Sequence, residues 1–136
     1  MTKRILIPGL IAGVVLLALS FAMLFGAVKL FPNVAVEYYN PVFRSGDERN
    51  ILFFIHPFIL SLALAWFWDR FKGLFTGSML VRDLELGIVY TLVATLPAMW
   101  ITFSAIDVSL TMVLTWLLYG FIQAAVAGLI FARMNP

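Results

Sequence analysis

Apolar residues fall in four long runs along the chain, and polar residues gather in the segments between them. Each run is close to the roughly 20 residues that an α-helix needs to cross about 30 Å of hydrocarbon. Periodicity alone cannot divide such continuous runs further, so the flanking polar residues define the ends. The pattern predicts four helices, at residues 5–28, 51–70, 80–106 and 108–133.

The segments between these helices decide the rest of the expected fold. Too little of the chain lies outside them for a second domain, so residues 1–136 are expected to form one transmembrane domain. Residues 29–50 contain two prolines and paired tyrosines, and we expect a compact extracytoplasmic loop between helices one and two. Residues 105–109 predict a tight hairpin in which Asp107 caps the last helix. The expected fold class is an all-α membrane protein, an antiparallel four-transmembrane-helix bundle.

Composition supports the membrane assignment. The chain is 63% hydrophobic and 12% charged, whereas soluble domains average about 45 to 50% and about 25%. A chain of 136 residues has too small an interior to bury that much apolar surface. The remaining charged groups, such as Arg82, Asp83 and Glu85, are expected to be the solvated ends of helices.

The positions of the basic residues predict an orientation. Six of them flank the ends of helices that would share one side, and three lie in the loop 29–50 on the other side. Basic residues are enriched in cytoplasmic loops, so we expect a protein of the bacterial inner membrane with both termini on the cytoplasmic side. The charges form no patch or stripe, which argues against a nucleic-acid partner. The six are Lys3, Arg4, Arg70, Lys72, Arg82 and Arg133, and the three are Lys29, Arg44 and Arg49.

His56 is the only histidine and lies inside the second apolar run, before Pro57. Ionisable groups at membrane depth are commonly functional, so one interpretation is a haem or metal ligand or a proton relay. One imidazole per chain, however, is a poor metal site without further ligands. The other interpretation is a neutral, structural histidine hydrogen-bonded to a hydroxyl on a neighbouring helix, with Thr102 and Thr115 as candidates, or to the loop.

Polar side chains form stripes on the third and fourth helices at helical spacing. If the two stripes face each other, they form a hydroxyl-lined seam that would admit a small solute or a lipid-like ligand. Alternatively, the threonines bond to their own helices and the stripes are ordinary packing. The candidate seam consists of His56, Thr91, Thr95, Thr102, Thr111, Thr115, Tyr119 and Gln123.

Small residues recur every four positions on the first and fourth helices, where they allow backbones to approach closely. The expected partner of the fourth helix is the first helix, or the fourth helix of a second copy. The candidate packing residues are Gly9, Gly13, Gly120, Ala124 and Gly128.

No catalytic signature is present. The sequence has no cysteine, no nucleophile beside its histidine and no glycine-rich phosphate loop. We therefore predict no catalytic residue, no metal site and no cofactor. The predicted function is that of a non-catalytic accessory or interaction subunit whose partners are the lipid bilayer and a second copy or a larger membrane complex. Two alternatives stay open: a channel or transporter for a small solute or lipid-like ligand that uses the seam, and a haem or metal protein that uses His56.

Overall fold

The structure, a computed structural model, describes residues 2–43 and 50–136. These residues form helices and turns, and no strand occurs among them. Four helical stretches are long and apolar enough to cross a membrane, which confirms the expected all-helical chain with four long apolar helices. Arg44 and Arg49, used above in the charge count, lie outside the described residues. The elements are α1 (Thr2–Leu30), α2 (Pro32–Glu37), α3 (Asn50–Phe71), η2 (Lys72–Leu74), α4 (Met79–Tyr90), η3 (Thr91–Thr95), α5 (Leu96–Ala105) and α6 (Leu110–Met134).

The third long stretch, predicted as one helix, is divided by a π-helical turn. The turn η3 separates α4 from α5, and the N–H of Leu96 bonds to the carbonyl of Thr91, five residues earlier. Pro97 follows directly and has no N–H to donate to an α-helical turn. A wider turn of this kind absorbs such an irregularity without ending the stretch.

The last helix begins at Leu110 and is capped by Ser109, so the expected cap at Asp107 is wrong. The Ser109 hydroxyl accepts a hydrogen bond from the N–H of Met112 at 3.1 Å. The Ser109 N–H itself donates to the Glu37 carboxylate at 3.0 Å. A carboxylate beside the positive end of a helix is favourable, and this contact ties α2 to the start of α6.

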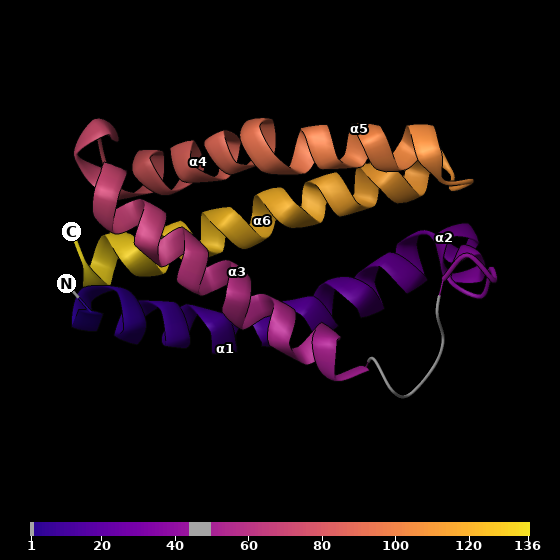
Figure 1. Cartoon of the computed structure of the whole chain (residues 1–136), viewed down its shortest axis with the longest axis horizontal. Coiled ribbons are helices and arrows are strands. Elements are labelled where there is room, and N and C mark those ends of the chain that lie inside the picture. Colours follow the sequence, from indigo (N-terminus) through magenta and orange to yellow (C-terminus); the bar gives the residue numbers. More distant parts are fainter. Residues whose placement is uncertain (1, 44–49) are drawn as a thin grey trace.

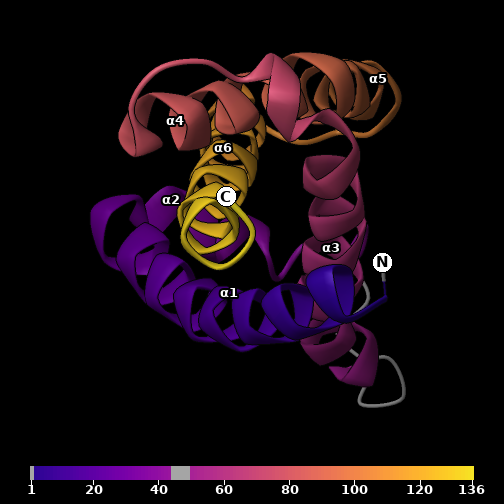
Figure 2. The same cartoon turned by 90° about the vertical axis from the view of Figure 1, so that its left-hand side faces the viewer.

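Helix α6 lies at the centre of the molecule. Seen along its length, it has α1 on one side, α4 and α5 on the opposite side, and α3 alongside (Figure 2). The two ends of the chain lie together at one end of the molecule, and α2 lies at the other end (Figure 1).

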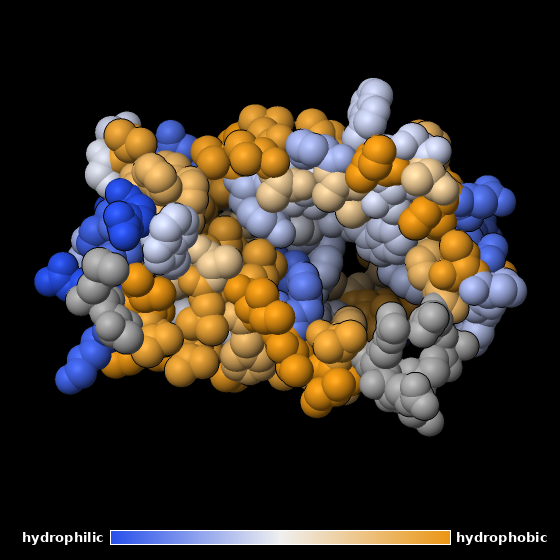
Figure 3. Space-filling view, in the orientation of Figure 1, coloured by the Kyte–Doolittle hydropathy of each residue, from blue (hydrophilic) through white to orange (hydrophobic). Residues whose placement is uncertain are grey.

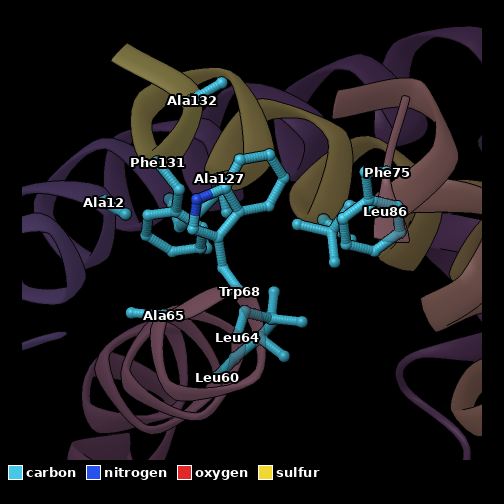
Figure 4. Close-up of a cluster of buried hydrophobic side chains, with 12 residues drawn as sticks. Ala12, Leu60, Leu64, Ala65, Trp68, Phe75, Leu86, Ala127, Phe131 and Ala132 are labelled. Carbon is cyan, nitrogen blue, oxygen red and sulfur yellow. The ribbon is translucent and has the colours of Figure 1, made fainter. Parts of the chain in front are cut away.

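Two buried apolar clusters hold these helices together. The larger joins α1, α3, α4 and α6; in it Trp68 reaches from α3 toward Phe131 and Ala127 of α6 (Figure 4). The smaller joins α2 to the first turns of α6 through Val34, Met112 and their neighbours. The smaller cluster lies at the end of the molecule where α2 lies, away from the termini.

Polar contacts close the end of the bundle where the termini meet. Asn135 donates to the Asp69 carboxylate at 2.9 Å and accepts from the Lys72 ammonium group at 2.7 Å. Its backbone carbonyl accepts from the Trp68 indole at 2.9 Å. The guanidinium carbon of Arg82 lies 5.0 Å from the centre of the Trp68 ring. The ends of α3 and α6 are therefore held to each other by hydrogen bonds as well as by apolar contact.

Candidate functional site

A cavity of about 450 Å³ opens between α1, α3 and α6, with Phe31 and Tyr38, the residues that flank α2, at one end. The space-filling view shows the molecule hollowed in this half, next to the first turns of α3 (Figure 3). Its volume falls within the range of about 300 to 1,000 Å³ typical of ligand sites. The described residues that line it are mostly apolar, and none of them carries a charge.

One wall of the cavity contains a chain of hydrogen bonds between α6 and α1. Gln123 donates to the hydroxyl of Tyr119 at 2.8 Å, and this hydroxyl lies 2.5 Å from that of Ser20. Ser20 in turn donates to the carbonyl of Leu16 at 2.8 Å. Since Ser20 uses its only proton on Leu16, the phenol proton of Tyr119 is the one shared with Ser20. The hydroxyls of Ser20 and Tyr119 are thus fixed in direction, and neither has a proton left to donate to a molecule in the cavity.

The end of the cavity near α2 is formed by aromatic side chains. The indole N–H of Trp116 donates to the hydroxyl of Tyr38 at 2.7 Å. Phe43 packs on both rings, with ring centres 5.5 Å from Tyr38 and 6.0 Å from Trp116. Tyr38 is held in place by these contacts, yet within residues 2–43 and 50–136 its own hydroxyl proton has no acceptor.

His56 lines the cavity from α3, and neither of the two threonines named above as its candidate partners holds it. Thr115 donates to the carbonyl of Met112 at 2.6 Å, and Thr102 donates to that of Ala98 at 2.8 Å. Neither hydroxyl reaches His56, because a threonine in a helix readily bonds to the preceding turn. The imidazole has no hydrogen-bond partner within the described part of the chain.

The structure brings together only part of the candidate seam. His56, Thr115 and Tyr119 line the cavity, and Gln123 is buried behind Tyr119. The remaining members do not line the cavity. Thr91 and Thr102 donate to carbonyls of the preceding turn, those of Gly87 and Ala98, and Thr111 is exposed. Thr95 packs against Gly120, and its hydroxyl is buried without a hydrogen-bond partner among the described atoms.

The glycines of the first helix face α3. A Cβ atom added to Gly9 would lie 2.8 Å from Leu62, and one added to Gly13 would lie within 3 Å of the Phe58 ring. Since real Cβ atoms do not approach so closely, these glycines mark where α1 and α3 are in close contact.

Gly120 and Gly128 of the last helix face η3 and α4, which are neither of the two expected partners, α1 or the last helix of a second copy. A Cβ atom on Gly120 would lie 2.9 Å from Thr95, and one on Gly128 would lie 3.0 Å from the Cα of Asp83. Ala124, between them in sequence, is fully buried.

Asp83 was expected among the solvated charges at a helix end, but it is only 6% exposed. It lies beneath Gly128 on the buried face of α4. One of its carboxylate oxygens is buried without a hydrogen-bond partner in the described residues. The sequence alone could not show that Asp83 is buried. It lies one turn inside the helix, and whether its side chain is buried depends on where α6 lies.

Sequence reasoning also missed Ser20, Tyr38 and Trp116 as members of the site. Ser20 had a usable signal, as a polar residue inside the first apolar run. The sequence indicates Tyr38 only as a residue of the loop.

Across residues 2–43 and 50–136, no group of three or more histidine, aspartate or glutamate side chains is placed to hold a metal ion. Comparisons with models of protein families, with curated proteins and with solved structures found no match to this chain.

Proposed function

We propose that the protein is a multi-pass membrane protein of the bacterial inner membrane that binds a lipid-like molecule in the cavity between α1, α3 and α6. It acts without catalysing a reaction, as a binding or accessory subunit. The observation that carries this proposal is the cavity itself, which combines apolar walls, a few oriented polar groups and no charged lining residue among those described.

The outer surface supports insertion in a membrane. Large apolar side chains are exposed along all four long stretches, among them Phe25 at 66%, Ile59 at 63%, Trp100 at 76% and Leu114 at 52%. Apolar residues also cover much of the middle of the molecule in Figure 3, with hydrophilic residues at its two ends. Soluble monomers rarely expose apolar patches of more than a few hundred Å², whereas lipid accommodates such a surface.

The contacts at the helix ends support an antiparallel bundle with both termini on one side. Asn135 lies near the carbonyl of Arg4 at 3.5 Å and bonds to Lys72, so the start of α1 and the ends of α3 and α6 are close together. All six basic residues expected inside belong to these ends, to η2 directly after α3, or to the adjoining start of α4. We propose that this end is cytoplasmic.

A reporter that is active only in the periplasm should stay silent when it is fused after Pro136. A reporter that works only in the cytoplasm should be active at the same position. The reverse pattern would show that the bundle is inserted the other way round. A fusion within the loop 44–49 serves as the control, since it should give the opposite result.

The cavity favours ligand binding over conduction of a solute. A pathway for a polar solute needs polar groups along its whole length, but Thr91 and Thr102 use their hydroxyl protons on their own helices. A cavity with mostly apolar walls and a few convergent polar groups is the usual form of a site for a small organic ligand.

Photocrosslinking tests this function directly. A benzophenone amino acid placed at Phe53, which lines the cavity, should capture one predominant molecular species in living cells. The same group at Phe103 is the matched control, because Phe103 is 48% exposed, against 44% for Phe53, but does not line the cavity. Phe103 should capture bulk phospholipid in proportion to its abundance. Identical adducts at the two positions would show that the cavity selects no ligand.

A further inference from the structure

We infer that the occupant of the cavity is a neutral, tailed molecule whose head presents carbonyl-type oxygens to two donors, His56 and Tyr38. This inference rests on the proposed function and assigns a chemical class to the ligand. The basis is which O–H and N–H protons of the lining side chains are already used in hydrogen bonds and which are not.

Most hydroxyl and N–H protons of the lining are already committed. Ser20 donates to Leu16, Thr115 donates to Met112, and the Trp116 indole donates to Tyr38. The phenol proton of Tyr119 is shared with Ser20, as shown above. An occupant that needed donors from these groups would have to break existing hydrogen bonds.

Two protons remain uncommitted among the described lining residues. The Tyr38 oxygen accepts from Trp116 at 2.7 Å, which orients the phenol and leaves its O–H to donate elsewhere. His56 in its neutral form carries one N–H and has no partner in the described residues. Tyr38 follows α2 and His56 lies on α3, so the two donors approach the cavity from different elements.

The site therefore matches a ligand that brings acceptors. Neither donor has an acceptor among the described residues, and the half-buried Tyr38 and the more exposed His56 would find none in the surrounding hydrocarbon. The two donors therefore favour an occupant whose oxygens can accept from both. A phosphate or carboxylate head does not fit, because no described lining residue is charged and a buried anion without a cation is strongly unfavourable. Carbonyl oxygens meet both conditions, since they are neutral and accept without donating.

Two kinds of membrane molecule share this chemistry. An isoprenoid quinone has carbonyl oxygens on a ring, and an acylglycerol has them in its esters. The apolar remainder of the cavity accommodates part of the tail in either case, and the aromatic rings of Phe53 and Trp116 offer surfaces to a head of either shape.

The experiment measures binding to the purified full-length protein in detergent by native mass spectrometry. The probes are decylbenzoquinone and dioctanoylglycerol, and decylbenzene serves as a tailed ring without oxygen. At least one carbonyl probe should bind about tenfold or more tightly than decylbenzene, as expected for two hydrogen bonds. The carbonyl probe that binds more tightly identifies which of the two sources the site prefers.

Variants assign the effect to the two donors. Tyr38→Phe and His56→Leu should each weaken binding of the preferred carbonyl probe by about three- to tenfold, and neither should change binding of decylbenzene. His56→Gln restores an N–H at that position and should regain part of the loss. Tyr39→Phe is the matched control, since Tyr39 is 87% exposed and lies outside the cavity. Melting temperatures of all variants show whether each is folded.

The outcomes separate this inference from the function on which it rests. If decylbenzene binds as tightly as both carbonyl probes and the donor variants change nothing, the assignment of the head group is overturned while the ligand site stands. If the folded wild-type protein binds none of the three probes, the proposed function is overturned as well.

Discussion

Replacing Gly128 by leucine is expected to lower the free energy of unfolding by about 1 to 3 kcal/mol, as over-packing of a close contact does. A Cβ atom at this position would lie 3.0 Å from the Cα of Asp83 and 3.1 Å from both its Cβ and a methyl group of Leu86. The nearest obstacle is backbone, which cannot rotate away as a flexible side chain could. Helices α4 and α6 would have to separate, and the buried contacts on both sides of Gly128 would be lost.

The matched control is Leu129→Ile, which changes shape at the adjacent half-buried position without adding volume. Thermal stability and oligomer size of both variants should be measured in the same detergent. Because α4 belongs to the same chain, we expect the folded monomer itself to lose stability. Loss of an oligomer with no change in the monomer would instead place Gly128 at a contact between copies, and equal stability of the two variants would contradict the close approach of α4.

Gly26→Leu is expected to reduce the co-purifying ligand to background while the protein stays folded. Gly26 lines the cavity, and a Cβ atom added there would meet nothing within 4 Å. A leucine therefore extends into the space that the ligand needs. The helix should not suffer, since leucine is favoured over glycine in a helix by roughly 0.5 to 1 kcal/mol. Loss of ligand without loss of stability distinguishes filling of the cavity from unfolding.

The control is Gly73→Leu, in η2 near the end of the molecule where the termini lie. A Cβ atom added to Gly73 would also meet nothing within 4 Å, but Gly73 does not line the cavity. Organic extracts of both proteins, isolated from native membranes and examined by mass spectrometry, should differ in the ligand alone. Equal ligand content in Gly26→Leu and wild type would mean that the molecule binds elsewhere.

The existence of the four long helices could be predicted from the sequence because continuous apolar runs of this length have few other structures. Their ends could be predicted less well. Val108 stands between Asp107 and Ser109, and either polar residue can cap a helix. The pattern therefore predicted a start at Val108 with Asp107 as the cap, whereas Ser109 is the cap and the helix begins at Leu110. The π-turn before Pro97 likewise keeps the apolar pattern intact and leaves no break in composition to detect.

The partners of each helix face could not be predicted. Gly9 and Gly128 both mark close contacts, but a glycine stripe carries no information about which helix approaches it, and the two stripes meet α3 and α4 instead of each other. The residues of the site could likewise be predicted only in part. His56, Thr115 and Tyr119 were found as polar residues in apolar runs, whereas the contribution of Tyr38 depends on how the segment after α2 folds back over Trp116.

The most direct test of the central claim is an experimental density map of the protein taken into lipid nanodiscs straight from its native membranes. The map should show elongated density between the second half of α1, the first half of α3 and the first half of α6, with its head within hydrogen-bonding distance of His56 and Tyr38. If these helices instead close on one another and leave no space, or if the space contains no ordered molecule, the proposal of a ligand-binding membrane protein is wrong.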